Sequence, residues 1–179
     1  RLLLISTDEV MVPGKRTRQH LNAVEAAEAA GVGHVLYTSL VNPGPQSPVT
    51  LAPDHHATET ALANGKMDWT ILRNNIYADG LAHTLAQAVQ MGQLVNAVGD
   101  GKIGYVCRED CARAAAAALG SDTSGRQVLN ITGADAVSQA ELAQIASELS
   151  GKQIAYVPVP VAALNETLLG FGLPPTIAD

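Results

Sequence analysis

The stretch "AAEAAGVGHVLYTSL", residues 26–40, decides the fold class of this chain. Its first half is rich in alanine and reaches Gly31, a residue type that commonly follows the last turn of a helix. Its second half, residues 34–39, is an apolar run that ends in small polar side chains, which is typical of a strand buried on both faces. A helix that runs directly into a buried strand indicates βαβ units with parallel strands.

The same alternation continues on both sides of this stretch. We expect strands at 1–6, 34–39 and 68–73, and helices at 17–30 and 53–63. Thr17 is the expected N-cap of the first helix, and Asn64-Gly65 ends the second. Strands that alternate with helices in this way predict an α/β protein with a Rossmann-like, doubly wound parallel sheet.

The later part of the chain is less regular. We expect helices at 80–91, 108–120, 139–150 and 161–169, and strands at 126–132 and 153–159. Ser138 and Glu141 have the spacing of a capping box at the start of one of these helices, and Gly151 closes it.

The motif "GDGKIG", residues 99–104, matches the G-x-G-x-x-G expression of a dinucleotide-binding loop. A true phosphate loop follows the first strand and opens a helix, but here "YVC" follows instead. We therefore expect a hairpin or two short strands around Asp100-Gly101, although Lys102 could still reach a ligand.

Composition excludes several classes of function. Of the 179 residues, 47% are hydrophobic and 16% charged, which is enough to bury one core and typical of one globular domain. A net charge of −6 without a run of basic residues argues against nucleic acid and membrane surfaces as partners. No apolar run approaches the roughly 20 residues of a membrane span. Cys107 and Cys111 are interpreted as small buried thiols, which predicts a reducing, cytoplasmic compartment.

Small polar residues follow or end the first three expected strands. They are Ser6, Thr7 and Asp8, then Thr38 and Ser39, then Asn74 and Asn75. The carboxyl ends of parallel strands share one edge of a sheet, where open α/β sheets bind their ligands. Strand ends are also polar because loops begin there, but the agreement of all three favours a cleft that binds a sugar, phosphate or carboxamide.

His55 and Glu59 lie four residues apart in "DHHATE", residues 54–59, on one face of the second helix. The carboxylate could hold the imidazole in one tautomer or as its cation, and the pair could face the cleft. The alternative is an exposed helical pair that stabilises the helix by roughly 0.2–0.5 kcal/mol. We expect no metal site, because the other histidines are dispersed and metals need three or four ligands.

Four segments carry a resemblance to a known family. They are "LLLIS", "AAEAAGVGHVLYTSL", "DHHATETALANGKMDWTILRNNIYADGL" and "GDGKIGYVCREDCARAAAAAL". Together they resemble the NmrA-like, atypical short-chain dehydrogenase/reductase family, and within it the NAD(P)H:quinone oxidoreductases, with triphenylmethane reductase a near relative. The likeness covers nearly the whole chain, and H-x-x-x-E, T-x-L-R-N, Y and G-D-G-K form a fairly specific combination.

The resemblance implies NADPH as cofactor, with NADH as the alternative, and hydride transfer to a small quinone-like acceptor. Loops 40–52 and 76–95 would surround the acceptor. The family's cofactor contacts match Ser6, Thr7, Asp8, Asn74, Asn75, Ile76 and Tyr77 in this sequence. Its H-x-x-x-E falls where other short-chain dehydrogenases carry Tyr-x-x-x-Lys, which puts His55 and Glu59 in the catalytic register. An NmrA-type sensor that binds the cofactor without catalysis is the alternative.

The resemblance also predicts how the chain is organised. Residues 1–179 would form one NAD(P)-binding domain without the family's first three strands and glycine-rich phosphate loop, so this chain alone would bind NADPH poorly and be inactive. Segments 92–106 and 151–179 would contribute to a smaller substrate-covering α+β part. The strand at 1–6 would lack a neighbour, and its uncovered apolar edge predicts self-association into a homo-oligomer.

Overall fold

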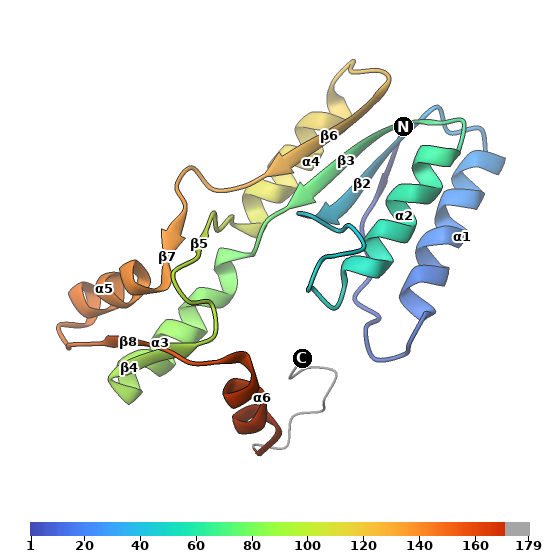
Figure 1. The fold of residues 1–179 in the computed structure, drawn as a ribbon. Helices are drawn as coiled ribbons and strands as arrows, with labels where there is room; N and C mark the ends of the chain where they lie inside the picture. Colours follow the sequence, from blue (N-terminus) through green and yellow to red (C-terminus); the bar gives the residue numbers. More distant parts are fainter. Residues whose placement is uncertain (171–179) are drawn as a thin grey trace. The chain divides into compact units, whose positions relative to one another are not determined.

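The computed structural model describes residues 1–170 (Figure 1). The chain divides into two compact units. Unit 1 comprises Arg1–Asn75 and Arg108–Thr132, and unit 2 comprises Ile76–Cys107 and the segment from Gly133 onward. Residues 92–106 and 151–170 fall in unit 2, whereas residues 171–179 of the expected smaller part lie outside the described residues.

A four-stranded parallel sheet forms the centre of unit 1. Its strands, in the spatial order β1-β2-β3-β6, are β1 Leu2–Leu4, β2 His34–Leu40, β3 Asp68–Asn74 and β6 Arg126–Ile131. β2 and β3 pair along their whole length, from His34 opposite Asp68 to Leu40 opposite Asn74. The α/β fold with a parallel sheet is therefore confirmed, although β1 ends at Leu4 and is shorter than the expected strand over residues 1–6.

Helices cover both faces of this sheet (Figure 1). α1 Lys15–Ala29 and α2 Ala52–Asn64 pack on one face, and α4 Arg108–Gly120 packs on the other. Alternating residues of the strands explain the core beneath α1 and α2, because Val35, Tyr37 and Ile71 point toward it and meet Val24 and Leu62.

The expected N-cap of α1 is wrong. The helix begins at Lys15 after Gly14, whose φ of 72° lies in the left-handed region that glycine adopts without a steric penalty. Thr17 lies inside the first turn, and its hydroxyl donates a hydrogen bond to the Asp54 carboxylate of α2. The side chain thus joins two helices instead of capping one.

Unit 2 contains the remaining helices and short strands. They are η1 Ala78–Gly80, α3 Leu81–Met91, β4 Gln93–Asn96, β5 Lys102–Ile103, β7 Val137–Ser138, α5 Gln139–Ser150, β8 Ala155–Pro158 and α6 Val161–Gly170. The capping box on α5 is confirmed, because the Ser138 hydroxyl accepts a hydrogen bond from the Glu141 N–H and the Glu141 carboxylate accepts one from the Ser138 N–H. Gly151 follows the helix with φ 68°, as expected.

The hairpin expected around Asp100-Gly101 is wrong, whereas the alternative of two short strands is right. β4 pairs in parallel with β8, and β5 pairs antiparallel with β7, so the two strands do not pair with each other. Lys102 contacts Glu141 at 3.1 Å within this unit. No helix starts directly after "GDGKIG", because α4 begins only at Arg108, so the motif lacks the helix N-terminus that a phosphate loop requires.

Only one of the two cysteines is buried. No disulfide joins Cys107 and Cys111. Cys111 is buried as expected, but Cys107 is exposed just before α4, so the expectation of two buried thiols is wrong for that residue.

Across residues 1–170, every helix is too short or too polar to cross a membrane.

Candidate functional site in unit 1

The carboxyl edge of the sheet brings together part of the predicted cofactor set. The Ser6 N–H donates to the Thr38 hydroxyl at 2.9 Å, and the two hydroxyls lie 3.3 Å apart, so the ends of β1 and β2 are in contact. Beyond β3, the Asn75 side-chain amide donates to the Thr132 hydroxyl at 3.3 Å. Thr132 was missed as a site residue, although it follows the fourth parallel strand just as the others follow theirs.

The other predicted cofactor residues have different surroundings. Asn74, at the end of β3, is only 7% exposed, and Asp8 is exposed. The Thr7 N–H donates to His20 of α1 at 2.9 Å. Ile76 and Tyr77 belong to unit 2, where Tyr77 forms a β-bridge with Val106.

His55 is a core residue of unit 1, because only 4% of it is exposed. Arg16 of α1 lies against one side of the ring, with Nη2 3.0 Å from His55 Nε2. Tyr37 of β2 lies against the other side, with its hydroxyl 2.8 Å from His55 Nδ1. Both ring nitrogens therefore have partners inside the protein.

The partners fix the tautomer of His55. An arginine can only donate, so His55 Nε2 must be the acceptor and Nδ1 must carry the proton. The Nδ1–H then donates to the Tyr37 oxygen. The Thr58 hydroxyl of α2 donates to the Asp54 carbonyl at 2.7 Å.

His20 completes the cluster and is fully buried. Its Nε2 accepts from the Thr7 N–H, so its proton is on Nδ1, which lies 3.1 Å from the Thr58 hydroxyl and 3.3 Å from that of Tyr37. We call Arg16, His20, Tyr37, His55 and Thr58 the buried cluster. Asp54 borders it, with its carboxylate 3.5 Å from Arg16 Nη1.

Burial sets the charge state of this cluster. Burial first, and then the neighbouring Arg16 cation, lower the pKa of His55 to about 4, while Asp54 opposes the shift. The pKa of His20 is lowered as well, mainly by burial and then by Arg16. Burial also raises the pKa of Tyr37 to about 12. At neutral pH both imidazoles and the phenol are therefore uncharged.

Glu59 lies one turn further along α2 and has different partners. The Arg73 side chain at the end of β3 forms a two-pronged ion pair with it, with Nε 3.1 Å from Oε1 and Nη2 2.6 Å from Oε2. The Ser39 hydroxyl of β2 donates to Oε1 at 2.6 Å. Glu59 raises the pKa of Arg73 by accepting these hydrogen bonds.

The structure matches neither interpretation of the His55 and Glu59 pair in "DHHATE". An exposed helical pair is wrong, because His55 and Glu59 are 4% and 8% exposed. The carboxylate does not hold the imidazole either, since Tyr37 and Arg16 fix the tautomer of His55 while Ser39 and Arg73 hold Glu59. Among residues 1–170, no group of three or more His, Cys, Asp or Glu side chains is placed to hold a metal ion.

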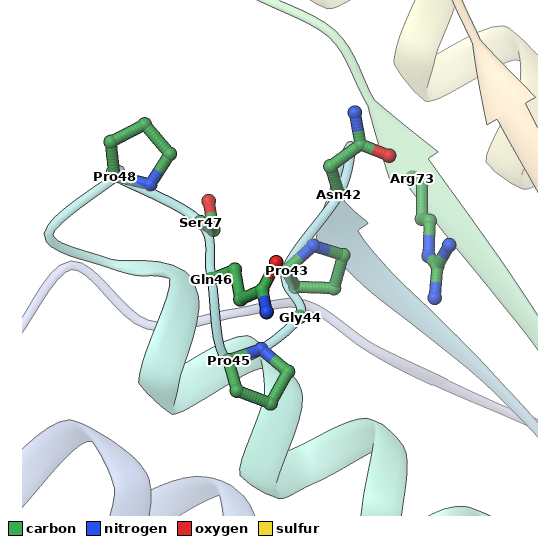
Figure 2. A pocket seen from close by; sticks show the side chains of 8 residues that line it. All are labelled: Asn42, Pro43, Gly44, Pro45, Gln46, Ser47, Pro48 and Arg73. Carbon is green, nitrogen blue, oxygen red and sulfur yellow. The ribbon is translucent and has the colours of Figure 1, made fainter.

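A hollow of about 670 Å³ lies beside Arg73 (Figure 2). Its wall is the loop after β2, residues 42–48, within the first of the two loops expected around an acceptor. A second hollow of about 320 Å³ continues between α2 and the strands β3 and β6, where Trp69 and Val128 contribute apolar surface. Pro43, Gly44 and Arg73 line both hollows.

The sequence of this chain is similar to those of known NAD(P)H-dependent enzymes. The profile of a family described as NAD(P)H-binding matches residues 5–122. Quinone oxidoreductase 2 of Escherichia coli is 37% identical over 179 residues, which are 100% of this chain and 61% of that protein. The NAD(P)H azoreductase of Xenophilus azovorans is 27% identical over 157 residues, which are 87% of this chain and 54% of that enzyme.

Solved structures give the same result. The NADPH-dependent quinone oxidoreductase of E. coli, crystallised with NADPH, matches with a TM-score of 0.90 and 37% identity, over 99% of this chain and 61% of that chain. The triphenylmethane reductase of Citrobacter sp. with NADP(H) matches with a TM-score of 0.87 and 33% identity, over 98% and 62% of the two chains.

A parallel sheet covered by helices on both faces, with polar side chains along its carboxyl edge, defines an α/β protein of the Rossmann type. The chain belongs to the NAD(P)H-binding family whose profile it matches, and its resemblance to the NmrA-like reductases is confirmed. It spans about 61% of the length of the E. coli relative.

Proposed function

We propose that the protein is an NAD(P)H-dependent oxidoreductase that reduces a quinone or a similar small acceptor. The observation that carries this proposal is the overlay of nearly all of this chain on a quinone oxidoreductase crystallised with NADPH. NADPH is the proposed donor and NADH the alternative.

The proposed cofactor-binding residues are those predicted at and after the strand ends. They are Ser6, Thr7, Asp8, Thr38, Ser39, Asn74, Asn75, Ile76 and Tyr77. The hydroxyl and amide groups of Ser6, Thr38 and Asn75 at the carboxyl edge of unit 1 support this proposal, because such groups can hydrogen-bond the sugar or carboxamide of a nicotinamide nucleotide.

The bound nicotinamide would supply the hydride, and the protein has to position the acceptor. We propose that His55 and Glu59 serve this reaction by holding other side chains. His55 has both ring nitrogens engaged with Arg16 and Tyr37, which leaves no free ring nitrogen to protonate a product. The reduced acceptor takes its proton from water.

Oxidation of NADPH by the complete protein, followed by absorbance with several quinones, tests the proposal. We expect turnover that depends on both substrates. Tight NADPH binding without turnover of any quinone would instead support the alternative, an NmrA-like regulatory sensor.

The compartment and assembly are also proposals. We propose a cytoplasmic protein, in line with two cysteines that form no disulfide, and no nucleic acid or membrane as partner. We also propose that the protein forms a homo-oligomer. Light scattering of the purified protein would reveal a dimer or larger assembly.

A further inference from the structure

Arg73 has a donor group directed away from its ion pair. Nε and Nη2 bind the two oxygens of Glu59, so Nη1 takes no part in this ion pair. Within the described part of the chain, Nη1 makes no hydrogen bond or ion pair, and 28% of the side chain is exposed. The guanidinium lines the hollow that residues 42–48 enclose (Figure 2). An N–H donor is therefore fixed at the wall of a hollow of ligand size.

Arg73 lies at the end of β3 and is held in place by side chains of α2 and β2. Glu59 on α2 grips the guanidinium from one side, and the Ser39 hydroxyl on β2 orients the Glu59 carboxylate at 2.6 Å. The ion pair of Glu109 and Arg113 on α4, with Asp110 3.6 Å from the same guanidinium, is instead 74% and 71% exposed. The Arg73 guanidinium is therefore held in one orientation before a ligand binds, unlike the arginine of an ordinary surface ion pair.

The opposite wall is stiff as well. Pro43, Pro45 and Pro48 each fix one backbone angle of the loop, and the Ser47 N–H closes a turn onto the Gly44 carbonyl at 2.9 Å. The Val41 N–H donates to the Asn74 carbonyl, which ties the start of the loop to β3. A hollow with restrained walls loses little freedom when a ligand binds.

The charges indicate which ligand suits the hollow. Glu59 offsets the net charge of Arg73, so the hollow has no unpaired cation that would require a fully charged ligand, and a neutral carbonyl oxygen can accept the hydrogen bond from Nη1. Proline rings and the apolar surface of Trp69 and Val128 in the adjoining hollow suit a planar aromatic body.

We propose that the hollow formed by residues 42–48 and Arg73 binds a planar aromatic carbonyl compound, with Nη1 of Arg73 donating to the carbonyl oxygen and Glu59 acting as its positioning residue. This proposal rests on the proposed function. A hydride brings two electrons and a hydrogen nucleus to a quinone, which becomes the hydroquinone monoanion while the cofactor is oxidised, and one proton from water completes the hydroquinone. Arg73 stabilises the negative charge that develops on the oxygen during the first step.

A matched pair of ligands tests the binding part without any turnover. 1-Indanone and indane have the same fused rings, but only 1-indanone has a carbonyl oxygen. Titration calorimetry in the absence of cofactor should show that the protein binds 1-indanone about tenfold more tightly than indane, as a hydrogen bond to a charged donor predicts. Arg73→Met should bring this ratio close to one, and Arg73→Lys, which keeps the cation, should lower it less.

Glu59→Gln tests the positioning role. It should reduce the ketone-to-hydrocarbon ratio. The double variant should have the same ratio as Arg73→Met alone, because Glu59 acts through Arg73. Arg113→Met removes one arginine from an exposed ion pair on α4 and should leave the ratio unchanged. A ratio that stays at the wild-type value in both Arg73 variants, with their circular dichroism unchanged, would overturn the proposal.

Turnover separates this inference from the proposed function. With a quinone that the protein reduces, Arg73→Met should lower kcat/KM by about 10²- to 10³-fold, as removal of one oxyanion donor does, without a change in NADPH affinity. Absence of quinone turnover in the complete wild-type protein, together with an Arg73-dependent ketone-to-hydrocarbon ratio, would refute the oxidoreductase activity and support the carbonyl-binding hollow. Normal turnover in Arg73→Met would refute the hollow's role alone.

Discussion

His55 and Glu59 lie one turn apart on α2, yet one belongs to a closed core and the other to an open site. The polar ring atoms of His55 bond to Arg16 and Tyr37 within the core. Glu59 holds an arginine that still has a donor at the edge of a hollow. Spacing of four residues places two side chains on one helix face, but the neighbouring strands and helices decide what each of them can do.

The closed region should be the more sensitive to loss of a charge. Arg16 is 5% exposed and contacts Asp54, His55 and the Thr7 carbonyl. Arg16→Met should lower the free energy of unfolding by about 3–5 kcal/mol, because it leaves a buried charge network without its cation. Urea denaturation measures the change.

The matched control is Arg113→Met on α4, where the ion pair is exposed. It should change the free energy of unfolding by less than about 0.5 kcal/mol. Equal losses in the two variants would mean that the buried cluster is no more important to stability than an exposed pair.

The stability of the closed region should also depend on pH. His55 has a pKa of about 4 in the folded protein, below its ordinary value of 6.5, because of burial and the Arg16 cation. Between these two pH values the unfolded chain binds a proton that the folded protein does not, so stability falls as the pH falls from 6.5 to about 4. The pKa difference corresponds to roughly 3 kcal/mol at pH 4.

His55→Gln removes this titrating group and should flatten the pH dependence in that window. The measurement is urea denaturation of both proteins at pH 7 and pH 4. His20, whose pKa is also lowered, remains in the variant and keeps part of the slope. The same loss of stability in variant and wild type between the two pH values would show that His55 is not held neutral by the cluster.

The fold was predictable from the sequence where the signals are local. β2, β3 and α2 appear within one residue of the expected ends, since an apolar run, a polar end and an Asn-Gly stop each lie within a few residues. The hairpin failed because β4 and β5 pair with strands that begin more than 30 residues further along the chain. No local pattern reports such a choice of partner.

The site was predictable only in part for the same reason. The sequence singled out His55 and Glu59, but not Arg16, Tyr37 or Arg73, which hold them. A signal was present: Arg16 is four residues before His20 on α1, and Arg73 continues the inward alternation of Trp69 and Ile71 on β3. Which of these faces meets α2 depends on tertiary packing, and spacing alone does not reveal it.

A smaller effect is expected from the hydroxyl group of Tyr37. It accepts the His55 Nδ1–H deep in unit 1, where Tyr37 is 0% exposed. Tyr37→Phe keeps the ring and leaves that N–H without an acceptor, so the free energy of unfolding should fall by about 1–3 kcal/mol. Urea denaturation at pH 7 tests this value, and a variant as stable as the wild type would show that the hydroxyl is not needed to hold the tautomer.

The smallest effect should be that of His55→Gln on turnover. A general acid contributes about 10²- to 10⁴-fold to a rate, but His55 has no free ring nitrogen to donate from, since Nε2 faces Arg16 and Nδ1 faces Tyr37. Once the oxidoreductase activity is measured, the variant should lose less than about tenfold in kcat with a quinone and keep its affinity for NADPH, whereas Arg73→Met should lose far more. Steady-state kinetics at pH 7, on variants whose circular dichroism matches that of the wild type, compare the two directly. A hundredfold or greater loss of kcat in His55→Gln, with unchanged NADPH affinity, would mean that the imidazole leaves Arg16 during the reaction. The buried cluster would then be part of the reacting site.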